Sequence, residues 1–237
     1  INKYRGINIS LTASQLEKAE KFLEAVAAEG KTVLWVGTKK AASKTVAEIG
    51  SRLHQPFVNH RWLGGMLLNW SQVKKSLTRL LHYEDILAKS ESNPFYTKKE
   101  LNTYKKTADK LEKTVGGIRK LTLPVGAVVV VDVTKEQSAV KEAALMGVPV
   151  VGIVDTNSDP SNVDVVIPGN DDSPQAISFI MNKLADAVVR GKEAAAKKVK
   201  DATDTAAAAK KAGAQQTMVE EAPSDVEIAL QQLDAQE

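Results

Sequence analysis

The sequence of 237 residues contains no cysteine, only three histidines and few aromatic residues. Without a thiol the chain can form neither a disulfide bond nor a thiolate zinc site. Its histidines, His54, His60 and His82, are scattered and share no metal-ligand spacing. The longest apolar run, 127–131, falls far short of the roughly 20 residues that a membrane-spanning helix needs. We therefore expect no membrane segment, no metal ion and no other cofactor.

The charge of the chain is more informative in its distribution than in its total. The formal net charge is only +3, but residues 1–190 carry +6, residues 191–211 carry +3 and residues 212–237 carry −6. A basic body favours a polyanionic partner. Residues 191–237 are rich in alanine and lack aromatic side chains, so we expect a mobile tail that is first basic and then acidic. The chain opens on Ile1, so we expect a processed chain or a fragment.

Apolar runs of strand length alternate with helical patterns at both ends of the sequence. Most of these runs do not alternate with polar residues, which is typical of parallel strands that are covered on both faces. The expected strands are 7–11, 32–36, 57–58, 127–133, 148–155 and 163–167, and the expected helices begin near residues 12, 41, 135 and 173, the last ending near Arg190. We predict an α/β domain with a mostly parallel sheet, formed by residues 1–65 and 121–190.

Residues 66–120 follow a different pattern. Apolar side chains recur at three- and four-residue spacing in two arms, with Pro94 between them, which predicts an antiparallel coiled-coil hairpin inserted into the α/β domain. The second arm, residues 98–120, has a net charge of +5. Such a charge is either a solvated helix face or a surface for a polyanion. The apolar positions are Trp70, Val73, Leu77, Leu80 and Leu87 in the first arm and Leu101, Tyr104, Ala108, Leu111, Val115 and Ile118 in the second.

The segment Gly37-Thr38-Lys39-Lys40 follows an expected strand and precedes an expected helix. A turn of this kind can present backbone N–H groups to a phosphate. The nucleotide-binding patterns GxxxxGK[ST] and GxGxxG are both absent from it. Three interpretations stay open: an ordinary turn with two solvated lysines, a nucleotide site, or contact of Lys39 and Lys40 with a nucleic-acid backbone.

A second basic segment begins at Arg61, in the sequence RWLGGM, and continues with Lys74, Lys75 and Arg79. Paired glycines allow a close approach of the backbone, and basic side chains beside them suit phosphate contacts. Lys75 and Arg79 are four residues apart, so they share a helix face. The alternative is that the flanking tryptophans anchor the core and the glycines only connect two elements.

Acidic residues follow the last two expected strands, at Asp155 and in the segment 169–172 (GNDD). Carboxylates at this edge of a parallel sheet could hold Mg²⁺. They could equally cap helices and turns, which we consider the better interpretation. No Ser/His/Asp set emerges, so no residue is assigned a catalytic role.

Two longer segments, 59–76 (NHRWLGGMLLNWSQVKKS) and 148–172 (VPVVGIVDTNSDPSNVDVVIPGNDD), make the pattern specific. With them, the chain from about Gly6 to Gly191 resembles ribosomal protein two of the small subunit, in its bacterial or organellar form. The resemblance implies a flavodoxin-like three-layer α/β sandwich with an inserted helical hairpin. The chain lacks the Gly-His pair and the Trp-Asn-Pro motif with which that family normally opens.

The resemblance also implies a non-catalytic role on the ribosome, in the cytoplasm or in an organelle. The implied partners are small-subunit ribosomal RNA and neighbouring small-subunit proteins, among them ribosomal protein one. Two alternatives are a nucleotide- or phosphosugar-binding enzyme on the same fold, and an adaptor whose hairpin recruits a protein. The residues that we expect to contact RNA are Lys39, Lys40, Arg61, Lys74, Lys75 and Arg79.

Overall fold

The computed structural model of the protein describes residues 6–89 and 96–220, with side chains described as far as residue 197. The chain divides into two compact units, residues 1–193 and residues 194–237. The first unit contains the whole sheet, and the second is described only as helix. Within the described ranges, no helix is both long enough and apolar enough to cross a membrane.

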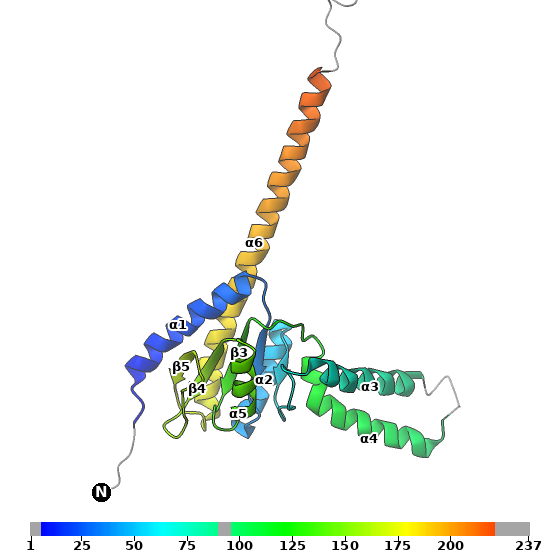
Figure 1. The fold of residues 1–237 in the computed structure, drawn as a ribbon, viewed down its shortest axis with the longest axis vertical. Coiled ribbons are helices and arrows are strands. Elements are labelled where there is room, and N and C mark those ends of the chain that lie inside the picture. The colour runs from blue at the N-terminus through cyan, green and yellow to red at the C-terminus, as the bar shows by residue number, and fades with distance from the viewer. Residues whose placement is uncertain (1–5, 90–95, 221–237) are drawn as a thin grey trace, which may run out of the picture. The chain divides into compact units, whose positions relative to one another are not determined.

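The centre of the first unit is a five-stranded sheet with the order β2-β1-β3-β4-β5 (Figure 1). Every neighbouring pair is parallel. Each residue of β1, β3 and β4 is buried, which explains why these strands read as unbroken apolar runs. The predicted α/β class and flavodoxin-like sandwich are confirmed. The strands are β1 (Val33–Val36), β2 (Phe57–Val58), β3 (Ala127–Val131), β4 (Val150–Val154) and β5 (Val165–Pro168).

Helices cover both faces of this sheet, so the domain has three layers (Figure 1). Because successive side chains of a strand point to opposite faces, Trp35 packs with one layer and Leu34 with the other. The first layer contains α1 (Ile9–Ala28), α2 (Lys40–Leu53) and the beginning of α6 (Pro174–Glu220). The second contains α5 (Gln137–Leu145) and the base of the inserted hairpin.

Helix α1 begins earlier than the sequence pattern suggested, and the predicted strand at residues 7–11 is wrong. Asn8 is the N-cap residue, and its Oδ1 accepts hydrogen bonds from the backbone N–H groups of Ser10 (3.0 Å) and Leu11 (3.4 Å). This cap satisfies donors that a helix start otherwise leaves unpaired. The Thr12 hydroxyl then donates to the carbonyl oxygen of Pro168 at 2.6 Å, which ties the new helix to the end of β5.

The inserted segment consists of two helices that lie side by side, α3 (Trp70–Lys89) and α4 (Lys98–Val115) (Figure 1). Its apolar seam follows the predicted spacing except near the end of α3. There Ile86 is the buried residue, and Leu87, which we expected in the seam, is only half-buried. Thr97 and Glu100 form a reciprocal capping box at the start of α4. The predicted turn around Pro94 lies outside the described residues.

The base of the hairpin is fixed by the short helix η1 (Gly116–Ile118) and by Arg119. Arg119 donates hydrogen bonds to Glu84 on α3 and Glu112 on α4, so one guanidinium joins both arms. The hydrogen bond with Glu84 and, less strongly, that with Glu112 raise the pKa of Arg119. Gly117 lies so close to Phe57 that a Cβ there would collide with its backbone oxygen, which accounts for the glycine.

The final helix, expected to end near Arg190, instead continues to Glu220. Its first part is held within the first unit, where Arg190 contacts Glu24 (3.1 Å) and Glu20 (3.0 Å) on α1. The continuation is rich in alanine and lysine, whose high helix propensity supports a helix without an apolar face. Mobility of this region stays a prediction, and most of the acidic segment lies outside the described residues.

Candidate nucleic-acid interface

The loop between β2 and α3 carries the RWLGG sequence and is organised by one buried carboxylate. Glu142 of α5, only 7% exposed, accepts hydrogen bonds from Trp62 Nε1 (3.0 Å), Gly65 N (2.7 Å) and Leu67 N (3.0 Å). Gly65 has a φ of 84°, in the left-handed region that glycine adopts without strain. The paired glycines and Trp62 therefore serve to hold this loop in one conformation against α5.

This fixed loop leads into the cationic side chains that the sequence singled out. Arg61, Lys74, Lys75 and Arg79 are all exposed. Among the described residues, none of these four forms an ion pair. Lys75 and Arg79 lie on one face of the first turns of α3, as predicted. These four residues, here called the α3 basic surface, therefore keep their charge available for an anionic partner.

Lys39 has a different environment from the other predicted RNA contacts. Its Nζ lies 2.7 Å from Asp171 Oδ1, 2.6 Å from Asp172 Oδ1 and 3.3 Å from Asp132 Oδ2. Burial alone would lower the pKa of the Lys39 ammonium, but its carboxylate partners outweigh that effect and raise the pKa. The charge of Lys39 is thus already balanced by its own chain, whereas Lys40 beside it is exposed and has no ion pair within the described ranges.

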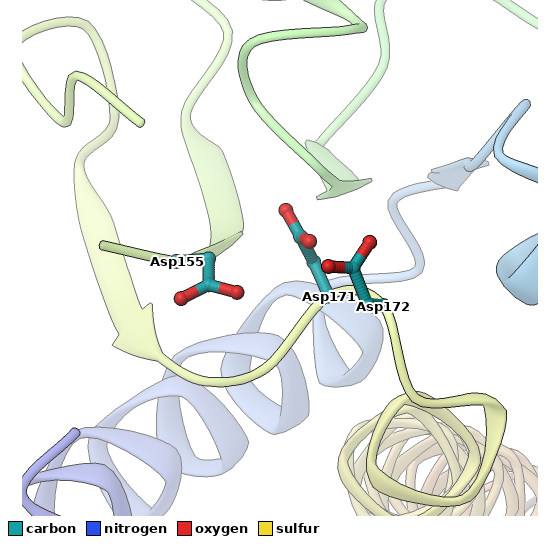
Figure 2. Close-up of side chains that lie close together, drawn as sticks. All are labelled: Asp155, Asp171 and Asp172. Atoms are coloured by element: carbon teal, nitrogen blue, oxygen red, sulfur yellow. The ribbon is translucent and has the colours of Figure 1, made fainter. Parts of the chain in front are cut away.

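The carboxylates of Asp155, Asp171 and Asp172 gather at the carboxyl ends of β4 and β5 (Figure 2). One oxygen of each lies within 4.8 Å of the others, which is a spacing that could hold a metal ion. Burial raises the pKa of Asp171, and the hydrogen bond from Lys39 opposes that rise. Because the lysine ammonium already supplies a positive charge at Asp171 and Asp172, the geometry favours the structural role.

Neither aspartate of this segment caps α6: Ser173 Oγ accepts from the backbone N–H of Ala176 at 3.5 Å, and Asn170 fixes the turn before the helix. Asn170 Oδ1 accepts hydrogen bonds from the backbone N–H groups of Asp172 (2.8 Å) and Ser173 (3.1 Å), directly before α6. The two aspartates are therefore free to face Lys39. The amide oxygen of Asn170 therefore caps a turn rather than the helix itself.

The turn after β1 is likewise satisfied from within the protein. Thr38 donates a hydrogen bond from its backbone N to Glu136 Oε1 at 2.9 Å, and its hydroxyl donates to the same oxygen. Glu136 is 2% exposed, so a buried carboxylate occupies a donor that a bound nucleotide phosphate would need. The roles of Glu136 and Glu142 were not predicted from the sequence. For Glu142 the available signal was an acidic residue placed among the buried positions of α5, whereas Glu136 is the N-cap residue that precedes this helix.

Together these features define a class of protein: a flavodoxin-like α/β protein with an inserted hairpin, in which exposed cations lie on and beside a loop that one buried carboxylate fixes. The family model for ribosomal protein S2 matches residues 1–191. The chain belongs to the ribosomal protein S2 family.

Curated relatives agree with this assignment. The chain is 43% identical over 196 residues to the small ribosomal subunit protein uS2 of Marinobacter nauticus, covering 82% of this chain and 77% of the relative. It is 43% identical over 194 residues to the uS2 protein of Acinetobacter baylyi, with 81% and 77% coverage. It is 42% identical over 209 residues to that of a Psychrobacter species, with 87% and 79% coverage.

Proposed function

We propose that the protein is a structural, non-catalytic constituent of the small ribosomal subunit. It binds small-subunit ribosomal RNA and neighbouring small-subunit proteins, and it acts on the ribosome in the cytoplasm. Membership of the ribosomal protein S2 family and the names of the curated relatives support this role. Ribosomal protein one is included among the partners on the family resemblance alone.

The observation that carries the RNA-binding part of the proposal is the α3 basic surface. Four exposed cations without ion pairs within the described ranges stand on α3 and on the loop before it, which Glu142 fixes in place. Unpaired lysine and arginine side chains bind RNA phosphates and release their counterions, which is favourable without any reading of base sequence. Lys40 adds a fifth exposed cation. Lys39 is the weakest member of the predicted set, because its ammonium is already engaged.

The proposal is tested with a triple variant in which Lys74, Lys75 and Arg79 are all replaced by glutamate, which reverses their charge. We expect the triple variant to fold normally, because all three side chains are exposed, and to be lost from small subunits in sucrose-gradient co-sedimentation. Full co-sedimentation of the variant would refute an RNA contact at this surface.

A matched control replaces three other exposed lysines, Lys18, Lys141 and Lys183, by glutamate. These residues lie on α1, α5 and α6, so the total charge change is the same but the α3 basic surface is intact. The control should remain with the subunit. Equal loss of both variants would show that only net charge matters and would count against the assigned surface.

A further inference from the structure

A cavity of about 460 Å³ opens at the carboxyl ends of β1, β2 and β3, next to the Gly37–Lys40 turn. Doubly wound α/β folds bind ligands at this edge of the sheet. The lining side chains that could contact a ligand are those of Lys40, Ser43, Lys44, His60 and Lys135. They come from three separate segments, which only the folded chain brings together.

The charge of this cavity is positive and largely unbalanced. No acidic residue is found among the described residues that line it. Lys40 and Lys135 form no ion pair with the described part of the chain, and Lys44 has only a loose, exposed pair with Glu48 at 3.8 Å. Lys135 Nζ donates to the backbone oxygen of Thr38 at 3.2 Å, which holds that ammonium at the cavity.

Neighbouring carboxylates are engaged elsewhere. Glu136 is buried and its Oε1 accepts from Thr38, while Asp132 and Asp171 contact Lys39. The N-cap residue of α2 has no side-chain capping bond, so the first N–H groups of this 14-residue helix add to the positive potential. The Ser43 hydroxyl at the cavity already donates to the backbone oxygen of Asn59 at 2.8 Å. The His60 imidazole beside several ammonium groups forms a donor set that suits the oxygens of one phosphate.

We propose that this cavity binds a single phosphate group of the small-subunit ribosomal RNA backbone. Lys40, Lys44 and Lys135 supply its charge, and the imidazole of His60 supplies a further hydrogen-bonding group. This site rests on the proposed RNA-binding function and extends it, because none of its lining residues belongs to the α3 basic surface. A free nucleotide carries the same phosphate chemistry, so the test separates the two sources.

The experiment measures the affinity of the protein for small subunits depleted of it, over a series of salt concentrations. The logarithm of the affinity falls linearly with that of the salt concentration, with a slope close to the number of neutralised phosphates. Changing Lys40, Lys44 and Lys135 together to glutamine should weaken binding by about tenfold or more and reduce the slope by about one. Three lysines on three separate phosphates would instead reduce the slope by about three.

Three outcomes would overturn the proposal. An unchanged affinity would show that the cavity does not meet RNA, and a slope reduced by about three would show that no single phosphate is shared. Saturable binding of ATP to the isolated protein at this cavity, with unaltered subunit affinity of the triple variant, would assign the site to a free nucleotide. Glutamine at Lys18, Lys141 and Lys183 is the matched control and should leave the slope unchanged.

The same assay keeps this proposal separate from the proposed function. The charge-reversal variant of the α3 basic surface is measured beside the glutamine variant. If that variant binds normally while the cavity variant is weakened, the surface assignment fails and the cavity stands. If the reverse is found, the cavity fails and the proposed function stands.

Discussion

Replacement of Glu142 by glutamine isolates the contribution of one buried carboxylate to the conformation of the RWLGG loop. The side chain keeps its size, and its amide oxygen can still accept from Trp62 Nε1 and Gly65 N. The amide nitrogen, however, then faces the backbone N–H of Leu67, which Glu142 Oε2 accepts at 3.0 Å. In the variant, the amide N–H₂ of the glutamine and the backbone N–H of Leu67 are both donors, so the hydrogen bond between these two groups is lost.

The expected loss of stability follows from these three hydrogen bonds. The Leu67 N–H becomes a buried donor without an acceptor, which costs about 1–3 kcal/mol. The other two bonds change from charged to neutral acceptors and lose about 0.5–1 kcal/mol each. The smaller desolvation cost of a neutral amide offsets part of this sum. We therefore expect Glu142→Gln to lower the free energy of unfolding by about 2–3 kcal/mol.

Urea unfolding followed by tryptophan fluorescence measures this loss, and amide hydrogen exchange at Gly65 and Leu67 shows where it arises. Exchange should accelerate at both amides. Glu48→Gln, an exposed carboxylate on α2, is the control and should change stability by less than about 0.5 kcal/mol. A loss below about 1 kcal/mol for Glu142→Gln, with unchanged exchange at Leu67, would refute the role assigned to this carboxylate.

Two further predictions concern the edge of the sheet and the crossing of α1 with α6. Lys39→Met should lower the free energy of unfolding by about 2–4 kcal/mol at pH 7, because its carboxylate partners lose their cation. The pKa of Asp171 is already raised by burial. A carboxyl group whose pKa is raised on folding stabilises the protein at low pH and loses that contribution as the pH rises. The difference in free energy of unfolding between the variant and the wild type should therefore become smaller from pH 7 to pH 4 in urea titrations. A difference that does not change with pH would contradict this. Gly191→Ala should lower the melting temperature, because a Cβ at Gly191 would collide with the backbone oxygen of Glu24. This effect should outweigh the helix propensity of alanine, which is about 1 kcal/mol more favourable than that of glycine. A higher melting temperature would show that α1 can move away from the added methyl group.

The strands and most helices could be predicted because their signals are local. In runs such as 127–131 the side chains on both faces of the strand are apolar. Such strands are typical of a sheet that has helices packed on both of its faces. The start of α1 was misjudged because residues 7–11 alternate like a strand, whereas the decisive group is the single Asn8 side chain. The end of α6 was misjudged because we required an apolar face, whereas the helix continues beyond Arg190 through a buried Gly191, a hydrogen bond from Lys192 to Leu53 and then a segment of high helix propensity.

The candidate sites divide in the same way. Exposure of Lys74, Lys75 and Arg79 follows from the helical spacing of their apolar neighbours and was predictable. The ion pairs of Lys39 could not be predicted, because its acidic partners lie 93 to 133 residues away along the chain. They meet Lys39 only when the parallel strands align. For the same reason Lys135 could not be connected with Lys40 from spacing alone.

The Lys39 contacts have a consequence for how this edge of the fold responds to its surroundings. A cation that belongs to the polypeptide cannot be removed by a chelator, and its occupancy does not depend on the concentration of any ion in solution. Magnesium depletion, which weakens folded RNA, should therefore leave the contacts of Lys39 with Asp132, Asp171 and Asp172 in place. The protein can keep its own shape through changes in ionic conditions that its proposed RNA partner would not tolerate.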